Sequence, residues 1–269
     1  MPEPRTPRCL SIATSDSGGG AGIQADVKAF AAAGCHGATV VVALTAQDTR
    51  GVTATHEVPQ PFIVAQLDAV FADLGIDAVK TGALVSAATA TTVAEFLETM
   101  RGAGALPALV IDPVLRASTG APLLDGDGVD VMRRRLLPLA AVVTPNRAEA
   151  VVLAGGDGSR HELAERIAAL GAGAVVITGG DTGDADHLFD GRTHIEIEVR
   201  HVESRATHGS GCTHSATLCA ELAKGADVES AARRAAAVTA GAVARGLADV
   251  GDGEGPVDVI GVNERRASA

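Results

Sequence analysis

The segment CLSIATSDSGGGAGIQADVKAFAAA, residues 9–33, contains a strand, a glycine-rich loop and a helix in direct succession. Cys9–Thr14 predicts the strand and Ile23–Ala33 the helix, and the same order recurs along the chain, where short β-branched runs alternate with alanine-rich stretches. Such alternation is typical of a parallel sheet covered by helices on both faces. We therefore expect an α/β fold whose ligands bind at the carboxyl ends of the strands.

Outside this segment, the sequence predicts further strands over Thr39–Leu44, Ala78–Thr81, Leu109–Asp112, Ala141–Thr144 and Ala174–Thr178. It predicts helices over Pro61–Leu74, Ala87–Met100, Val129–Leu137, Arg147–Leu153, Glu162–Leu170, Cys212–Lys224 and Val228–Gly246. The runs His187–Asp190 and His194–Val199 predict an antiparallel pair of strands. No linker or internal repeat divides the sequence, so we expect one domain over residues 1–269, with a loosely held tail after about residue 257.

The composition argues against several classes of partner. Hydrophobic residues make up 46% of the 269 residues, enough for a sizeable core, but aromatic residues make up only 2%, with no Trp and no Tyr. Few rings are thus available to stack on single-stranded nucleic acid, and the formal net charge of −11 argues against nucleic acid and anionic membranes. No apolar run reaches the length of a membrane span and the N-terminus lacks the layout of a signal peptide, so we expect a cytoplasmic protein. The four cysteines show no CxxC pair, which argues against a disulfide framework or a zinc site at these spacings.

The turn THGSGCT, residues 207–213, leads directly into an apolar run that predicts a helix. A glycine-rich turn at the start of a helix points several backbone N–H groups at one spot, and the helix dipole adds partial positive charge there. The amides of Gly209, Ser210, Gly211 and Cys212 therefore predict an anion site. The same field is expected to lower the pKa of the Cys212 thiol. An anion site beside an ionisable group suggests phosphoryl transfer.

Other interpretations of this turn stay open. Cys212 can be a small apolar residue at a helix start, as we expect of Cys219, seven residues later. His208 and His214 flank the turn and could form a Cys–His couple for covalent catalysis. A Gly-Ser-Gly loop, however, suits a phosphate better than an acyl oxyanion.

The loop Thr14–Asp26 follows a strand and precedes a helix, as a nucleotide-binding loop does. It lacks the Gly-Lys-Ser/Thr ending of a Walker A loop and does not match GxGxxG. It is either a tight turn with a helix cap or a place where the backbone, at Gly22 for example, approaches a small ligand closely. Asp26, one turn into the helix, either accepts hydrogen bonds from a ligand amine or partners the helix dipole.

Polar residues that follow three other strands are further candidates. Gln47 offers an amide that can pair with both a donor and an acceptor on a heterocycle edge, although it can equally be an ordinary loop residue. Asp112 ends a strand, and Asn146 and Glu149 form an Asn-x-x-Glu run after another. Such hard oxygen ligands suit the Mg²⁺ that phosphoryl transfer from ATP requires. The same run equally predicts a helix cap with an acidic residue at the third helical position.

Six motifs occur in order between about Cys9 and Val257. They are Ser15-Asp16 with Gly18–Asp26, Thr45–Gln47, Lys80–Leu84, Asp112–Val114, Thr144–Asn146 and Thr207–Thr213. Through them the chain resembles the hydroxymethylpyrimidine/phosphomethylpyrimidine kinases of thiamine biosynthesis, which belong to the ribokinase-like superfamily. The resemblance implies a three-layer α/β/α sandwich with a mostly parallel central sheet, and a homodimer. It also implies an ATP- and Mg²⁺-dependent kinase that phosphorylates a small-molecule substrate, 4-amino-5-hydroxymethyl-2-methylpyrimidine, and then its monophosphate.

The resemblance also assigns roles to individual residues. Asp26 and Gln47 would bind the aminopyrimidine, and Cys212 would be the candidate base beside the reacting hydroxyl. The Gly209–Cys212 backbone would stabilise the transferring phosphoryl group. The other residues that it places in the site are Thr14, Gly22 and Ala83 for the substrate, Asn146, Thr178 and Gly180 for ATP, and Asp112 and Glu149 for Mg²⁺.

The chain departs from the family pattern at several positions. Thr14 stands where the family usually has Gly, and Ala83 where many members have Met, so we expect a reshaped substrate pocket. Ser118-Thr119 replaces Lys-Ser, and Thr178-Gly179-Gly180 replaces Lys-Gly-Gly, which removes two basic groups that could meet phosphates. Glu254-Gly255-Pro256 replaces His-Gly-Pro. A pyridoxal or pyridoxine kinase and a catalytically weak pyrimidine-binding sensor remain alternatives.

Overall fold

The computed structural model describes residues 5–116, 120, 123–179, 185–200 and 202–267, and within these ranges it confirms the predicted α/β fold. Nine strands of the described residues form one sheet in the order β3-β2-β1-β4-β5-β6-β7-β8-β9. The strands are β1 (Arg8–Asp16), β2 (His36–Asp48), β3 (Gly51–Glu57), β4 (Ala78–Thr81), β5 (Ala108–Ile111), β6 (Val142–Val143), β7 (Val175–Ile177), β8 (Ala185–Phe189) and β9 (His194–Glu198). The six strands from β2 to β7 in the sheet order run parallel, whereas β3, β8 and β9 each pair antiparallel with a neighbour.

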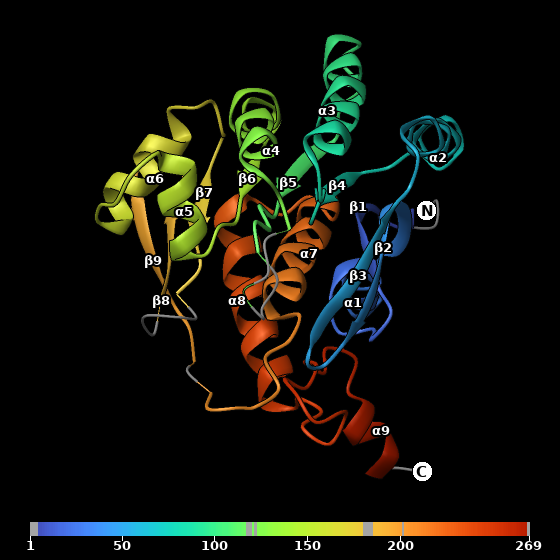
Figure 1. The fold of residues 1–269 in the computed structure, drawn as a ribbon. Helices are drawn as coiled ribbons and strands as arrows, with labels where there is room; N and C mark the ends of the chain where they lie inside the picture. Colours follow the sequence, from blue (N-terminus) through green and yellow to red (C-terminus); the bar gives the residue numbers. More distant parts are fainter. Residues whose placement is uncertain (1–4, 117–119, 121–122, 180–184, 201, 268–269) are drawn as a thin grey trace.

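Helices cover both faces of this sheet (Figure 1). They are α1 (Gly22–Ala32), α2 (Gln60–Asp73), α3 (Ala87–Gly102), α4 (Gly126–Val131), α5 (Arg147–Ala154), α6 (Arg160–Ala168), α7 (Ser210–Ala223), α8 (Val228–Ala244) and α9 (Val262–Ala267). Helices α1, α7 and α8 lie on one face, and α2 to α6 lie on the other. The helix predicted over Val129–Leu137 is α4 continued by a π turn and a 3₁₀ turn, which end beside Pro138. In the described ranges, no helix combines the length and apolar character that a bilayer crossing requires.

Alternation along the strands builds two separate cores. Leu10 and Ile12 of β1 pack with α2 and α3, whereas Cys9 packs with α1 and α7. This follows because successive side chains of a strand point to opposite faces of a sheet. The central strands are buried on both faces, so they are mostly apolar instead of alternating, with Ser11 in β1 and Lys80 in β4 as buried polar exceptions.

The sequence analysis missed the hairpin of β2 and β3 at one edge of the sheet. Strand β2 continues past the predicted end at Leu44 to Asp48, and β3 follows after two residues. Most of β3 is exposed, so its sequence carries no alternation of apolar and polar residues that would predict a strand. The pairing with β2 is a tertiary contact that local pattern does not reveal.

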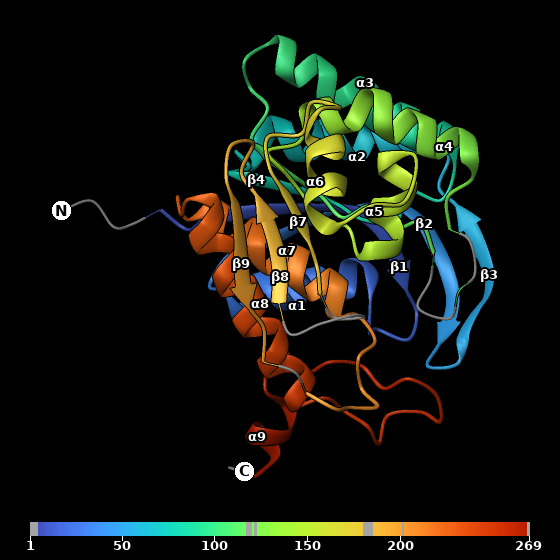
Figure 2. The same cartoon turned by 90° about the vertical axis from the view of Figure 1, so that its left-hand side faces the viewer.

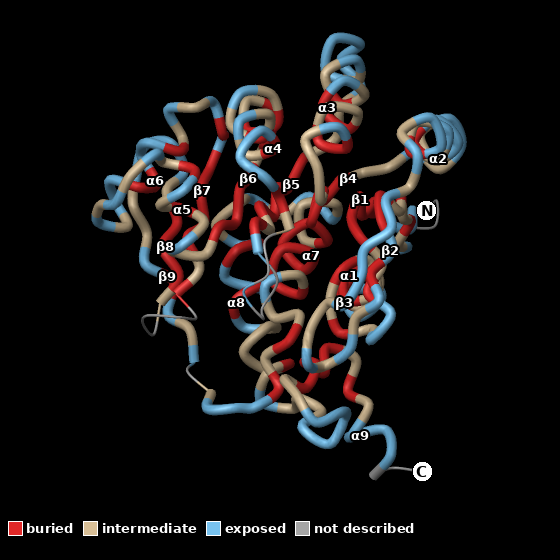
Figure 3. The backbone as a smooth tube through the Cα atoms, in the orientation of Figure 1, coloured by how far each residue is buried: buried red, intermediate tan, exposed pale blue. Residues whose placement is uncertain are grey.

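The prediction of a loosely held tail after about residue 257 is wrong for its first part. Val257, Asp258 and Val259 are buried, and the chain that leads into α9 contains buried stretches (Figure 3). The Val257 amide donates to the His208 carbonyl oxygen at 3.1 Å, and the Asp258 amide donates to the Ala242 carbonyl oxygen at 3.0 Å. The tail is therefore tied to the turn that precedes α7 and to α8, partners that are distant in the sequence.

Replacement of Phe30 by Ala tests the core between α1 and α7. Phe30 is fully buried, so Phe30→Ala is expected to lower the free energy of unfolding by about 3–5 kcal/mol through lost burial and a residual cavity. Phe62 is 61% exposed on α2, so Phe62→Ala is expected to change it by less than about 0.5 kcal/mol. Urea denaturation followed by circular dichroism measures both. Equal losses in the two variants would contradict this description of the core.

Candidate functional site

A cavity of about 720 Å³ opens at the carboxyl ends of the parallel strands. Residues at or just after the ends of β1, β4, β5, β6 and β7 line it, together with the start of α7 and part of α8. Most predicted site residues are in this lining: Thr14, Gly22, Gln47, Ala83, Asp112, Asn146, Glu149, Thr178, Gly209, Ser210, Gly211 and Cys212. Gly180, like Ser118 and Thr119, lies outside the described residues. The structure thus brings these predicted site residues together at the carboxyl ends of the parallel strands, as expected for a parallel sheet.

The turn before α7 is held against the first glycine-rich loop. Gly209 has a left-handed backbone conformation with φ 82°, and a Cβ there would lie 1.8 Å from the Gly20 carbonyl oxygen, so only glycine fits. The Ser210 amide donates to the Thr207 carbonyl oxygen at 3.0 Å, whereas no described residue accepts from the amides of Gly211 and Cys212. Two of the predicted donors are therefore available to an anion, and Ser210 closes the turn instead.

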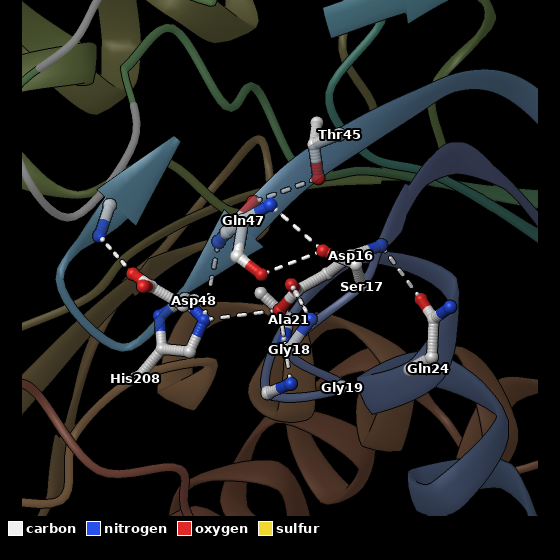
Figure 4. A network of polar contacts seen from close by, with 12 residues as sticks. Asp16, Ser17, Gly18, Gly19, Ala21, Gln24, Thr45, Gln47, Asp48 and His208 are labelled. Carbon is white, nitrogen blue, oxygen red and sulfur yellow. Dashed lines mark hydrogen bonds and ion pairs between the residues drawn. The ribbon is translucent and has the colours of Figure 1, made fainter. Parts of the chain in front are cut away.

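Asp16 organises the first loop and connects it to the second (Figure 4). Its carboxylate accepts hydrogen bonds from the amides of Gly18, Gly20 and Ala21 at 2.7, 3.0 and 2.8 Å, and His208 Nε2 lies 3.2 Å from its Oδ2 atom. Burial by itself would raise the pKa of Asp16, but the bonds to His208 and to the loop amides outweigh it and lower this pKa. Asp16 is therefore a charged centre of the loop, a role that the sequence analysis did not assign.

Gln47 is fixed by the same network (Figure 4). Its Oε1 atom accepts from Thr45 Oγ1 at 3.1 Å, and its Nε2 atom lies 3.3 Å from His208 Nε2. Its backbone exchanges two hydrogen bonds with the Ser17 hydroxyl. An ordinary loop glutamine would not have these anchors, so the amide is oriented at the cavity wall before any ligand binds.

The histidines that flank the turn have acidic partners. His208 contacts Asp16, and His214 Nε2 lies 3.2 Å from Asp186 Oδ2. Burial opposes ionisation of Asp186, yet the contact with His214 and the bond from the Gly179 amide lower its pKa. An acidic partner on one ring nitrogen is compatible with a thiol on the other, so the Cys–His couple stays an alternative prediction.

A buried cluster of charges extends from the cavity lining, to which Lys80 and Asp112 belong, into the protein interior. Lys80 on β4 is fully buried, and its ammonium lies 2.9 Å from Asp26 Oδ1 and 3.4 Å from Asp112 Oδ2. Ser11 donates to Asp26 at 2.5 Å, and Ser215 of α7 donates to Asp112 at 2.8 Å. Burial alone would lower the pKa of Lys80, but the neighbouring carboxylates, Asp26 above all, raise it, so the amine stays charged.

Asp26 lies deeper than the other predicted site residues. It is fully buried and does not belong to the cavity lining, so its contact with a ligand amine stays a prediction. Burial raises its pKa, while Lys80 and Ser11 oppose that rise. Its position in the first turns of α1 is used for a structural ion pair with β4, which no spacing in the sequence could indicate.

The ionisation of Cys212 also differs from the expectation. The helix terminus predicts a lowered thiol pKa, but the pKa of Cys212 is raised to about 12. Burial is the largest cause, the carboxylates of Asp112 and Asp26 add to it, and Lys80 and a backbone bond from Gly22 oppose it. We therefore expect Cys212 to be a neutral thiol at pH 7 in the ligand-free protein.

Asn146 and Glu149 form a capping box at the start of α5, which is the helix-cap interpretation of the Asn-x-x-Glu run. Asn146 Oδ1 accepts from the Glu149 amide at 2.9 Å, and Glu149 Oε2 accepts from the Asn146 amide at 3.0 Å. Glu149 Oε1 accepts from the Leu115 amide at 3.3 Å, so backbone donors already engage both carboxylate oxygens. Asp112 differs, because no described residue donates to its Oδ1 atom. Of the two predicted metal ligands, Asp112 thus has the freer oxygen for direct coordination.

Two arginines in the lining were missed. Arg116 and Arg200 line the same cavity, in loops after β5 and β9. They supply cationic groups to a cavity in which the family's two lysines are absent. No motif or periodicity marks them, because a loop arginine is common on any surface.

Comparison with known proteins shows similarity over nearly the whole chain. Residues 16–258 match the family described as phosphomethylpyrimidine kinase. The hydroxymethylpyrimidine/phosphomethylpyrimidine kinase of Rhizobium meliloti strain 1021 is 44% identical over 257 residues, which cover 92% of this chain and 95% of that relative. The pyridoxal kinase of Bacillus subtilis, solved as an ADP complex, has a TM-score of 0.86 at 34% identity and covers 94% of this chain and 97% of its own. The pyridoxal kinase of Staphylococcus aureus in complex with AMP-PCP and pyridoxal has a TM-score of 0.85 at 30% identity, with 97% and 96% covered.

The raised pKa of Cys212 predicts slow alkylation that accelerates with pH. Only the thiolate attacks iodoacetamide, so the rate at Cys212 is expected to rise about tenfold per pH unit from pH 7 to pH 9. Mass spectrometry of the peptide that contains Cys212 measures this rate, and Cys212→Ser serves as the blank. A plateau of the rate below pH 9 would show instead that the helix terminus dominates and that the thiol has a low pKa.

Proposed function

Because the chain belongs to the phosphomethylpyrimidine kinase family, we propose that the cavity at the carboxyl ends of its strands phosphorylates hydroxymethylpyrimidine and then its monophosphate, using ATP. This activity belongs to thiamine biosynthesis. The observation that carries the assignment to this cavity is the presence in one lining of an oriented amide, Gln47, and of the unpaired amides of Gly211 and Cys212. The side-chain amide of Gln47 suits an aminopyrimidine edge, and the backbone amides of Gly211 and Cys212 suit a transferring phosphoryl group.

The pyrimidine would lie against the ends of β1 and β4. Gln47 would hydrogen-bond the ring edge, while Thr14 and Ala83 would shape the wall around it. Thr14 and Ala83 are 7% and 6% exposed, so they act through their size rather than through flexible contacts. Asp26 supports this wall from behind through Lys80 and has no direct contact with the ring in the proposal.

Phosphoryl transfer would take place at the start of α7. A loose transition state asks mainly for positioning and charge stabilisation, which the amides of Gly211 and Cys212 and the dipole of this 14-residue helix supply. Cys212 would receive the hydroxyl proton late. Its thiolate is a minor form but a strong base, and the buried ammonium of Lys80 favours that form.

The nucleotide would occupy the other half of the cavity. Asn146 and Thr178 line it at the ends of β6 and β7, and Arg116 and Arg200 would meet the phosphates there. The alternative of a catalytically weak sensor rested on the absence of two family lysines, and in this proposal the two arginines supply the positive charge in their place. Asp112 would bind Mg²⁺ directly and Glu149 through water, since both Glu149 oxygens accept backbone bonds. The bound ion would neutralise charge that develops on the phosphates. The expected homodimer and cytoplasmic location stay predictions.

Pyridoxal phosphorylation is the second candidate, because a pyridoxal kinase solved with pyridoxal has a TM-score of 0.85 to this chain. We expect kcat/KM for the aminopyrimidine to exceed that for pyridoxal by about tenfold or more, since Gln47 would lose a hydrogen-bonding partner on the second ring. Parallel assays of ADP formation with both rings measure the ratio. Equal or better turnover of pyridoxal would reverse the assignment.

Replacement of Cys212 by Ala tests the proposed base. We expect kcat to fall about 10²-fold or more, with little change in the KM for the pyrimidine. In the wild type, log(kcat/KM) is expected to rise with a slope of about one between pH 7 and pH 9, and Cys212→Ala is expected to remove that slope. Cys219→Ala, on the same helix but in the core, should leave kcat unchanged. Equal losses of binding and rate in Cys212→Ala would identify Cys212 as a packing residue.

A further inference from the structure

Three histidines from two distant parts of the sequence meet at the far edge of the sheet. His161 lies near the start of α6, His187 lies within β8 and His194 begins β9. One ring nitrogen of each can be chosen so that all three lie within 4.8 Å of one another. Within the part of the chain that the structure describes, this is the single group of three or more His, Cys, Asp or Glu residues with such geometry.

The cluster is separate from the catalytic cavity. Asp186 lines that cavity and faces α7, whereas the next residue along β8, His187, points to the opposite face of the sheet, toward α6. Figure 2 shows β8 and β9 at this edge with α6 beside them. The imidazole of His161 packs against those of His187 and His194 with ring centroids 4.3 and 4.4 Å apart.

Two carboxylates set the tautomers of two of the rings. Glu196 Oε1 lies 2.7 Å from His187 Nδ1, and Glu165 Oε1 lies 3.2 Å from His194 Nε2. A carboxylate requires a proton on the nitrogen that faces it, so neutral rings would carry their protons on these two atoms. The remaining nitrogens, His187 Nε2 and His194 Nδ1, then both present lone pairs, yet they lie only 2.9 Å apart.

Two lone pairs that face each other at this distance suit a cation bound by both nitrogens. Neutral imidazoles whose outer nitrogens donate to carboxylates are the usual supporting arrangement of metal-bound histidines. In a tetrahedral site with Zn–N bonds of about 2.0 Å, the nitrogens lie about 3.3 Å apart. Here His187 Nε2 and His194 Nδ1 are 2.9 Å apart, and one nitrogen of each of the three rings lies within 4.8 Å of the others.

We propose that His161, His187 and His194 form a binding site for a divalent transition ion of the zinc class. Zn²⁺ would bond to one nitrogen of each ring. His161 is exposed, which leaves a fourth position open to water. The ion would join α6 to the β8–β9 hairpin, and the chain after β9 goes on to Arg200 in the cavity lining.

Zinc titration of the full-length protein without an affinity tag tests this site. After treatment with a chelator, isothermal titration with ZnCl₂ is expected to show one tight equivalent in the wild type. His161→Gln and His194→Gln are expected to weaken it more than about tenfold, since each removes a ligand. His36→Gln, at an exposed histidine outside the cluster, is the matched control and should bind as the wild type does.

Replacement of the two carboxylates provides a second test in which all three histidine ligands remain. Glu196→Gln and Glu165→Gln are expected to weaken Zn²⁺ binding by about 10- to 100-fold. Zn²⁺ is also expected to raise the Tm of the wild type and of His36→Gln, but not that of His194→Gln. The proposal would be overturned if the wild type bound no tight equivalent of Zn²⁺. It would also be overturned if His161→Gln and His194→Gln bound Zn²⁺ with the same affinity as the wild type.

Discussion

The ion pairs of the Lys80 ammonium with Asp26 and Asp112 are the interaction on which the proposed catalytic cavity depends. An unpaired charge in a protein interior costs several kcal/mol, so each partner must be in place for the others to be tolerated. Lys80 lies on β4, Asp26 on α1, and Asp112 directly follows β5. Ser11 of β1 donates to Asp26, and Ser215 of α7 donates to Asp112. One buried charge thereby fixes the relative positions of three strands and two helices at the cavity wall.

This cluster also determines the electrostatic environment of Cys212. Lys80 favours a thiolate, but burial and the two carboxylates oppose it, and the raised pKa of Cys212 is the balance. A thiol with a raised pKa is a weaker nucleophile at neutral pH than a thiolate. It remains suited to phosphoryl transfer, where the reacting groups need positioning more than early proton removal. If Cys212 is the base, as proposed, the protein holds it beside the reacting hydroxyl without maintaining a reactive thiolate.

A second network, centred on Asp16, joins the two glycine-rich turns. Its carboxylate holds the first loop through three amides and contacts His208, whose amide and carbonyl bond to the chain near Gly255 and Val257. The tight fit of Gly209 against Gly20 completes this connection. The turn that would hold the phosphoryl group is therefore anchored on one side by the first strand–loop–helix unit and on the other by the C-terminal segment.

The order of strands and helices, the parallel sheet and the membership of most lining residues were predictable, because they follow from local periodicity and from the rule that parallel strands end at one edge. The capping box of Asn146 and Glu149 could also be predicted from the sequence, since it is contained within four residues. The role of Asp26, the pKa of Cys212, the strand β3 and the anchored tail were decided only by the tertiary structure. Each depends on a partner that is distant in the sequence, and neither a buried charge nor the loss of water around a thiol leaves a mark in local pattern. A sequence specifies which groups the chain carries, whereas the packing of distant segments sets the partners and the dielectric that determine how those groups ionise.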